Sequence, residues 1–386
     1  MTIAVRGGRK QQRMIHFNKP SITEIEEGFI REAIHGSICG DGTFTKRATA
    51  LFLEKTGLAN AMLTTSCTHA LELSALLADI RDGDEVILPS FTFSSTANAF
   101  LLRGAALRFC EIDPLTMNAD PVHIASLVTG RTKVIAPIDY AGIACDIDAM
   151  SDIAEKHDLL IVQDAAQAVG SLYKGRPVGV DSDFACFSFH ETKNYVMGEG
   201  GAIFIKNPDL YQKAEMLREK GTDRSCFWRG EVDKYSWHTV GSSFLPSDIL
   251  AAMLLGQLTR FEEIMQKRMR AWDFYFDALE ALESAGKLRR PVVPTYARHN
   301  AHLFYILLDS GRERDELHDF LREKGIGAVI HYVPLHSSPF GCAMGNRPED
   351  LPLTEEYAAR LLRLPLFPDI SEAECDHIVS SVQDYY

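Results

Sequence analysis

The sequence has no apolar stretch that approaches the ~20 consecutive residues needed by a membrane-spanning helix. Its first ten residues are basic but contain no apolar core of signal-peptide length. We therefore expect neither membrane insertion nor export, and a cytoplasmic protein. Positive charge is also scarce: 40 lysines and arginines face 53 aspartates and glutamates, a net charge of −13. This balance argues against a nucleic-acid-binding surface, which needs a basic face.

Paired cysteines are missing as well. The eight cysteines are scattered, none forms a CxxC pair, and no histidine cluster accompanies them at the spacing of zinc ligands. Several lie inside apolar runs, as Cys110 does. We expect reduced thiols in the core and no metal site.

Short apolar runs alternate with longer amphipathic stretches between about Met62 and Ile205. Such alternation predicts an α/β fold with a mostly parallel sheet covered by helices. Strands buried on both faces are rich in Val, Ile, Leu and Phe, as these runs are. The expected strands are 85–89, 107–112, 133–137, 159–162 and 202–205.

The pattern changes after residue 247. A long helical stretch runs to about residue 282, and a proline-flanked break at 291–294 follows it. Strand-like runs at 302–308 and 327–333 and helical patterns at 314–324 and 354–362 then predict a smaller α+β part. We expect an unstructured extension over 1–13, a large cofactor-binding domain over 14–260 and a small C-terminal domain over 261–386.

Two residues that can carry chemistry stand at the ends of apolar runs. Asp164 follows the run 159–162, and Lys193 follows Ser188 by five residues, ahead of a glycine-rich loop at 198–201. Alone, the carboxylate is as well explained by a helix cap, and the lysine by a solvated side chain. Together they match the needs of pyridoxal phosphate (PLP), whose aldehyde a lysine holds as a Schiff base while a carboxylate keeps the ring nitrogen protonated.

Other features occur in the order that this cofactor needs. The segment 66–68 precedes a helical pattern, where backbone N–H groups and hydroxyls bind a phosphate or merely cap the helix. Phe93 follows an expected strand end, where its ring stacks on a planar cofactor or fills the core. The glycines at 198–201 precede a strand, so they do not form a dinucleotide-binding loop. The interpretation as a PLP site depends on all of these features together, because each one alone has a simpler explanation.

With these motifs the chain resembles the DegT/DnrJ/EryC1/StrS family of PLP-dependent nucleotide-sugar aminotransferases, which have the aspartate aminotransferase-like fold (fold type I). The resemblance begins at about Met14 and rests on segments 65–68, 83–87, 89–93, 163–167, 188–194, 331–336 and 364–367. Within the family, segments 188–195, 219–225 and 229–237 are similar to the transaminases that make dTDP-4-amino-4,6-dideoxygalactose.

The resemblance implies roles for matching positions. Lys193 would form the Schiff base, Asp164 would pair with the pyridine nitrogen, and Gln167 with the ring hydroxyl. Phe93 would stack on the ring. The phosphate would be held by Cys67, Thr68 and Ser188. Active sites in the family lie between two subunits, so a homodimer with shared sites is implied.

The implied reaction moves an amino group from L-glutamate to C4 of dTDP-4-keto-6-deoxy-D-glucose. The products are dTDP-4-amino-4,6-dideoxy-D-galactose and 2-oxoglutarate, for glycan or antibiotic biosynthesis. An equatorial (gluco) C4 amine and a 3-keto sugar nucleotide stay open as alternatives. A non-catalytic binding protein is disfavoured by the intact Lys193 and Asp164. A dehydratase is disfavoured because the related dehydratases carry histidine in place of the lysine.

Five further residues are candidates for substrate binding. Arg229, Lys234 and Tyr235 lie in an aromatic-flanked segment that either binds the nucleotide or forms an exposed, ion-paired loop. His331 and Tyr332 belong to a family-like segment.

Two positions depart from the family pattern. Leu245 stands where many members place an asparagine that reaches the partner's phosphate site, and Asp139 stands where histidine is usual. The first departure puts the partner's phosphate contact in doubt, and the second adds a carboxylate near the cofactor.

Overall fold

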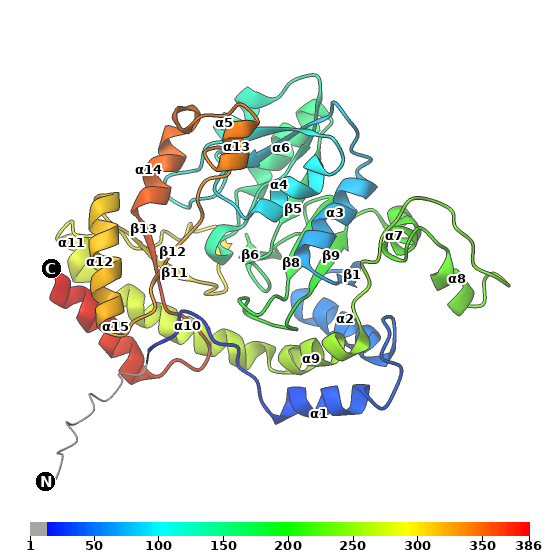
Figure 1. Cartoon of the computed structure of the whole chain (residues 1–386), viewed down its shortest axis with the longest axis horizontal. Helices are drawn as coiled ribbons and strands as arrows, with labels where there is room; N and C mark the ends of the chain where they lie inside the picture. The colour runs from blue at the N-terminus through cyan, green and yellow to red at the C-terminus, as the bar shows by residue number, and fades with distance from the viewer. Residues whose placement is uncertain (1–13) are drawn as a thin grey trace, which may run out of the picture.

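The computed structural model describes residues 14–386; the expected unstructured extension over 1–13 lies outside the described residues. Its centre is a seven-stranded sheet in the order β1-β9-β8-β5-β4-β2-β3 (Figure 1). The strands are β1 (Ala61–Thr64), β2 (Glu85–Pro89), β3 (Ala106–Cys110), β4 (Thr132–Ile135), β5 (Leu160–Asp164), β8 (Phe184–Ser188) and β9 (Gly201–Ile205). Every pair from β8 to β3 is parallel, and β9 runs antiparallel to both of its neighbours. The mostly parallel sheet expected from the apolar runs is confirmed.

Helices cover both faces of this sheet, which is why its strands are apolar throughout. Successive residues of β2 illustrate the division: Ile87 packs into one core, and Val86 and Leu88 pack into the other. The first core is covered mainly by α2 (Thr43–Thr56), α5 (Pro121–Leu127), α6 (Ile147–His157) and α9 (Asp248–Thr259). The second is covered by α3 (Cys67–Leu77), α4 (Ser94–Leu101) and α7 (Tyr211–Arg218).

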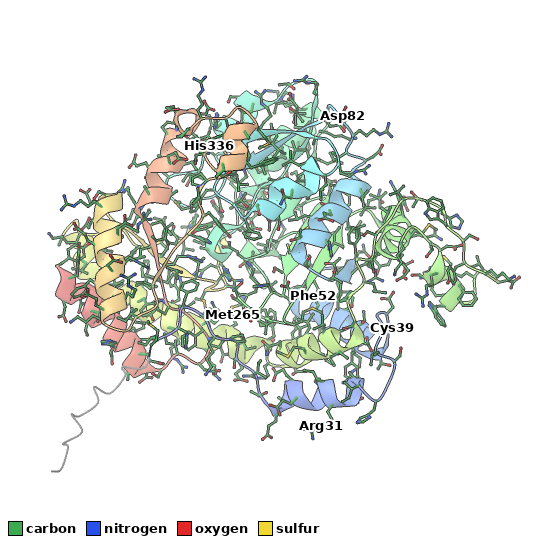
Figure 2. All side chains as sticks on the ribbon, in the orientation of Figure 1. Arg31, Cys39, Phe52, Asp82, Met265 and His336 are labelled. Carbon is green, nitrogen blue, oxygen red and sulfur yellow. The ribbon has the colours of Figure 1, made fainter. Side chains whose placement is uncertain are left out.

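Aromatic packing ties the helices to the sheet. Phe52 of α2 is fully buried and meets Phe187 and Phe189, with ring centroids 5.5 Å apart in each pair. Figure 2 shows Phe52 inside the molecule, whereas Arg31 of α1 (Glu24–Ala33) and Asp82 lie at its periphery. The segment that carries Ser188 and Lys193 therefore starts from a rigid base.

A second layer is built by the C-terminal part of the chain. Its sheet has the order β11-β13-β12, from β11 (Phe304–Leu307), β12 (Val329–Ile330) and β13 (Leu361–Leu364). The surrounding helices are α10 (Phe261–Ala278), α11 (Glu280–Ser284), α12 (Gly311–Glu323), α13 (Pro339–Ala343), α14 (Pro352–Arg360) and α15 (Glu372–Tyr385). A small sheet β10-β6-β7, from β6 (Leu172–Tyr173), β7 (Arg176–Pro177) and β10 (Ala297–Arg298), joins the two parts.

The structure differs from expectation in one element of the C-terminal part. The helical pattern over 354–362 ends at Arg360, and the next residues form β13, the central strand of the small sheet. The beginning of the described chain also pairs with the C-terminal part: Ile15 exchanges backbone hydrogen bonds with Gly325 and Gly327, and Leu366 donates to Phe17. Residues 15–17 thus contact the C-terminal part of the chain.

Candidate active site

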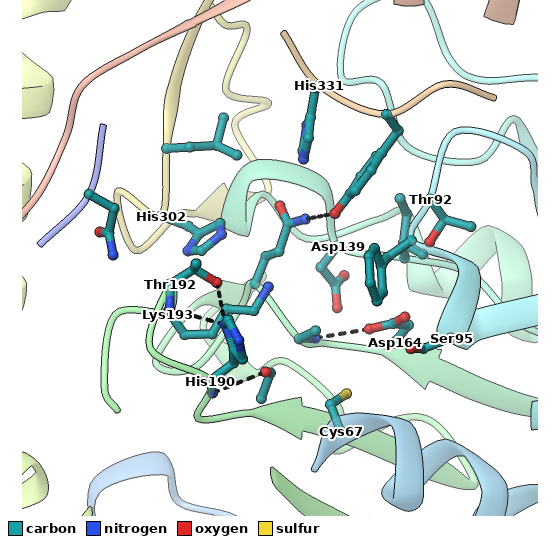
Figure 3. A pocket seen from close by; sticks show the side chains of 18 of the residues that line it. Cys67, Thr92, Ser95, Asp139, Asp164, His190, Thr192, Lys193, His302 and His331 are labelled. Atoms are coloured by element: carbon teal, nitrogen blue, oxygen red, sulfur yellow. Dashed lines mark hydrogen bonds between the residues drawn. The ribbon is translucent and has the colours of Figure 1, made fainter. Parts of the chain in front are cut away.

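A cavity of about 840 Å³ lies where the carboxyl ends of the parallel strands face the C-terminal part of the chain. Ligands bind at this edge of open α/β sheets, since the loops after the strands converge there. From the sheet side it is lined by Phe93, Asp139, Asp164, Ser188 and Lys193. From the other side it is closed by segments 302–303 and 329–332 and by Arg363 and Leu366. Figure 3 shows side chains from both parts converging on it.

Lys193 is positioned by a compact loop between β8 and β9. Backbone hydrogen bonds join Phe189 to Gly200, Glu191 to Gly198, and Lys193 to His190 over 2.8–2.9 Å. The lysine side chain points into the cavity (Figure 3). Burial lowers its pKa below that of a free lysine, against the opposing effects of Cys67 and Asp164. A neutral amine, as a proton-transferring base requires, is thereby favoured.

Asp164 ends β5 and is almost fully buried. Its Oδ2 accepts from the Thr96 hydroxyl at 2.6 Å, and its Oδ1 accepts from the Ala166 amide at 3.1 Å. Both donors are neutral, and no described lysine, arginine or histidine forms an ion pair with it. Burial raises the pKa of this carboxyl. A cationic ligand such as a protonated ring nitrogen would supply the missing partner.

The N-terminus of α3 lies at one end of the cavity. Ser66 caps the helix by accepting from the His69 amide at 3.1 Å, so the predicted cap exists. The amides of Cys67 and Thr68 keep no acceptor within residues 14–386. The Thr68 hydroxyl lies 2.7 Å from that of Ser95, and Ser188 lines the same cavity. Free N–H groups, the helix dipole and hydroxyls together suit a phosphate.

The remaining walls suit a planar ring. Phe93 keeps 60% of its surface exposed although it lines the cavity, so its ring is uncovered. Gln167 accepts from the Ala141 amide at 2.7 Å and donates to the Tyr332 hydroxyl at 3.0 Å. Tyr332 in turn stacks on His331. Gln167 is thereby held in one orientation with a second amide hydrogen available for a ring hydroxyl.

These observations fit PLP residue by residue. A buried carboxylate lacks a cationic partner, two helix-terminal amides lack an acceptor, and an aromatic ring and a lysine line the same cavity. The structure brings together Lys193 and all six other predicted cofactor residues, as well as His331 and Tyr332.

The other three predicted substrate residues lie elsewhere. Arg229, Lys234 and Tyr235 follow α8 (Arg224–Trp228), which projects from the body on the right of Figure 1, and none lines the cavity of its own chain. Arg229 is paired with Glu215 and Glu231 at 2.9 and 2.7 Å.

The two departures from the family pattern have different surroundings. Asp139 is buried at the cavity, where its carboxylate accepts from the Cys145 amide and the Gln163 side chain, each at 2.9 Å. Burial raises its pKa to about 7. Leu245 packs closely over Gly40, away from the cavity of its own chain.

Three residues of the site were not found from the sequence. Thr96 lies on α4 and holds Asp164; His302 lines the cavity and hydrogen-bonds Asn194 at 2.9 Å. Arg363 lies on the unexpected strand β13. None has a local signal: Thr96 contacts a residue 68 positions away and His302 one 108 positions away, and only the fold brings these side chains together.

Comparison with known proteins identifies the fold and the chemistry. The sequence model of the DegT/DnrJ/EryC1/StrS aminotransferase family matches residues 20–383. The chain belongs to this family. The aminotransferase is 32% identical over 385 residues to the spore coat polysaccharide biosynthesis protein SpsC of Bacillus subtilis, with 97% of this chain and 98% of that protein covered.

Solved structures agree with this assignment. TlmJ, an aminotransferase from Streptoalloteichus hindustanus, matches with a TM-score of 0.88 and 29% identity over 96% of this chain and 98% of its own. The PLP form of Spr1654 from Streptococcus pneumoniae matches with a TM-score of 0.89 and 27% identity over 96% and 98%. The aminotransferase therefore has fold type I and uses PLP. Among residues 14–386, no helix is long and apolar enough to cross a membrane, and no group of three or more possible ligands is arranged to hold a metal.

Proposed function

We propose that the enzyme transfers an amino group from L-glutamate to C4 of dTDP-4-keto-6-deoxy-D-glucose. The products are 2-oxoglutarate and dTDP-4-amino-4,6-dideoxy-D-galactose. The observation that carries the transaminase chemistry is the cavity that joins Lys193, Asp164 and the N-terminus of α3. The sugar acceptor is supported by the resemblance in segments 188–195, 219–225 and 229–237, and by the relative SpsC, a polysaccharide biosynthesis protein.

Each residue of the cavity has a separate role in the proposed reaction. When bound, PLP supplies an electron sink that stabilises negative charge on the carbon that bears the amino group. Lys193, whose neutral form burial favours, would remove a proton from that carbon and, in the second half-reaction, deliver one to C4 of the sugar. Asp164 would hold the proton on the ring nitrogen, and the amides of Cys67 and Thr68 would hold the phosphate. Tyr332 and His331 exclude water from one wall.

The face on which Lys193 delivers the proton decides the configuration at C4. The galacto product is our first choice because of the segment resemblances, the gluco amine is the second, and a 3-keto acceptor is the third. We also propose a homodimer in the cytoplasm. Arg229, Lys234 and Tyr235 would bind the nucleotide in the partner's cavity, and Ser242 or Ser243 would replace the phosphate contact that Leu245 cannot make.

The test is the structure of the product. The purified protein, L-glutamate and dTDP-4-keto-6-deoxyglucose should give an amino sugar whose NMR coupling constants report an axial amine at C4. Lys193→Ala should give no product. An equatorial C4 amine or an amine at C3 would replace our proposal with one of its alternatives, and no amination would reject this acceptor.

A further inference from the structure

A buried serine and a buried histidine join the two parts of the chain outside the active-site cavity. Ser90 directly follows β2, and His336 ends the segment 331–336 that begins at the cavity wall. Both side chains are fully buried, and within residues 14–386 neither lines the cavity. His336 lies beside α13, where its carbonyl comes close to Gly341 (Figure 2). The pair can therefore influence the cofactor site only through other residues.

Three hydrogen bonds hold the two residues together. The Leu335 amide donates to the Ser90 carbonyl at 2.9 Å, and the His336 amide donates to the Ser90 hydroxyl oxygen at 3.0 Å. The same hydroxyl lies 2.6 Å from His336 Nδ1. Nε2 lies 3.4 Å from both the Pro348 carbonyl oxygen and a carboxylate oxygen of Glu355. Because both of these atoms are acceptors, we assign the ring proton to Nε2, and the Ser90 hydroxyl then donates to Nδ1.

The order Glu355–His336–Ser90 resembles that of a hydrolytic triad, but this serine has no access to a substrate. Its hydroxyl is fully buried outside the cavity, and its oxygen already accepts from the His336 amide. A nucleophile needs room for a reacting atom beside it. The three side chains therefore have a positional role and not a chemical one.

From Ser90 the hydrogen bonds continue to the proposed cofactor carboxylate. The Ser90 carbonyl also accepts from the Thr92 amide at 3.0 Å. The hydroxyls of Thr92 and Thr96 lie 2.9 Å apart, and that of Thr96 donates to Asp164 Oδ2 at 2.6 Å. Since Thr96 gives its proton to Asp164, Thr92 donates to Thr96, and the direction of both hydroxyl bonds is fixed.

The same short segment carries aromatic side chains of the site. Phe91 meets His331 and Tyr332 edge-on, with ring centroids 5.9 and 5.5 Å apart. The ring of Phe93 lies 6.4 Å from that of Tyr332. A displacement of Ser90 would therefore move the aromatic platform and the threonine hydroxyls together.

We propose that His336 is a positioning residue of the PLP site, on which it acts through Ser90 without touching the cofactor. The bond from the Ser90 hydroxyl to Nδ1 holds the end of β2 in place and so orients the hydroxyls that fix Asp164. Glu355 keeps the ring proton on Nε2, which leaves Nδ1 free to accept. The assignment rests on the proposed role of Asp164 at the ring nitrogen and is independent of the sugar acceptor.

Two substitutions separate the two ring nitrogens. His336→Asn keeps a polar acceptor near the position of Nδ1, whereas His336→Gln places its amide near Nε2 and leaves the Ser90 hydroxyl without an acceptor. Equilibrium dialysis measures the affinity for PLP, and visible circular dichroism reports the orientation of the bound ring; neither depends on turnover. His336→Gln should weaken PLP binding ~10-fold and diminish the dichroism, and His336→Asn should stay within about threefold of the wild type.

Two further variants complete the comparison. Ser90→Ala removes the same bond from its other end, so it should match His336→Gln, with no added loss in the double variant. It also takes the place of His336→Gln if that variant does not fold. His377→Gln is the control, because His377 hydrogen-bonds the Lys324 carbonyl at 3.0 Å away from the cavity, and both readouts should stay at wild-type values.

A merely structural histidine predicts another result. Both His336 variants would then melt at lower temperature, while PLP affinity and the dichroism of the bound cofactor stayed unchanged. That outcome, or equal losses in His336→Asn and His336→Gln, would overturn the proposal. Asp164→Asn is measured alongside: if it alters both readouts while His336→Gln alters neither, the cofactor site stands and only the positioning role fails.

Discussion

Burial shifts the pKa values of Lys193 and Asp164 in opposite directions. The lysine is pushed toward its neutral form, and the carboxyl is also pushed toward its neutral form, because a low dielectric disfavours any charge. A cation placed beside Asp164 would lower the pKa of this carboxyl again, whereas the pKa of Lys193 would stay low. With PLP bound as proposed, Asp164 would hold one positive charge at the ring nitrogen, while burial would keep favouring the neutral amine of Lys193.

The first prediction concerns this carboxylate. Asp164→Asn should keep the fold but slow both half-reactions by orders of magnitude, because an uncharged amide cannot hold the ring-nitrogen proton. Rapid-mixing absorbance measurements of each half-reaction provide the test. Asp120→Asn is the matched control, since Asp120 only caps α5 and asparagine caps equally well. A loss below about tenfold, or roughly 1.4 kcal/mol of barrier, would mean that Asp164 is not that partner.

Asp139 gives a prediction about stability and pH. Its pKa rises from 3.8 when unfolded to about 7 when folded, because it is buried. The folded state binds the proton more tightly, so the contribution is present below pH ~4 and is lost as the pH rises toward 7. Relative to Asp139→Asn, the wild type should lose up to roughly 4 kcal/mol over this range. Thermal melts of both proteins at several pH values measure the difference, and parallel curves would contradict it.

Among the elements, the junction of β9 and α3 positions the helix terminus that we propose binds the phosphate. Gly201 pairs with Ser188 and with Thr64, and its backbone lies directly against the start of α3. A Cβ atom there would come within 2.5 Å of the Cys67 amide nitrogen. Only glycine lets the strand and the helix terminus approach this closely.

Gly201→Ala should therefore displace the α3 terminus and weaken PLP binding by at least ~10-fold, together with a lower melting temperature. Equilibrium dialysis of PLP and calorimetry measure the two effects. Gly28→Ala in α1 is the control, because nothing lies within 4 Å of a Cβ there, and it should stabilise the helix by about 0.5–1 kcal/mol. Unchanged PLP affinity in Gly201→Ala would show that the terminus does not hold the phosphate.

The sequence predicted the elements whose pattern of apolar residues is contained in one short stretch of the chain. Buried parallel strands are continuous apolar runs, so the central sheet and the strand-end positions of Asp164 and Lys193 could be read directly. β13 could not, because its apolar residues continue the helical pattern of α14 without a break. Arg363 was missed for the same reason: an arginine at the end of an expected helix is normally solvated, and only the pairing of β13 with β11 and β12 turns it toward the cavity.

For the whole molecule, the segment around α8 is the clearest exposed apolar feature. Trp228 and Trp237 have 70% and 75% of their surfaces exposed, and Tyr235 is exposed beside them. Clusters of exposed aromatic side chains are typical of contact surfaces. A second subunit is the partner that the proposed shared active site requires.

The corresponding prediction is that dilution below the dimer dissociation constant releases PLP and abolishes activity together. Trp237→Ser should raise that constant, as measured by sedimentation across a concentration series. Leu102→Ser is the control, because Leu102 is 70% exposed at a distant helix end. A monomer that keeps full activity and its cofactor would contradict the shared site.

The lining of the cavity extends along the chain from Phe17 to Leu366. Asn18 hydrogen-bonds the carbonyl of Glu191 beside the reactive lysine, while Phe17 accepts from Leu366. During synthesis on the ribosome, Phe17 is made early, whereas Leu366 is added only near the end of translation. The contact between them therefore forms late. We therefore expect PLP to bind only after nearly the whole chain has been made. A translation product that stops before β13 would carry Lys193 without the wall that encloses it.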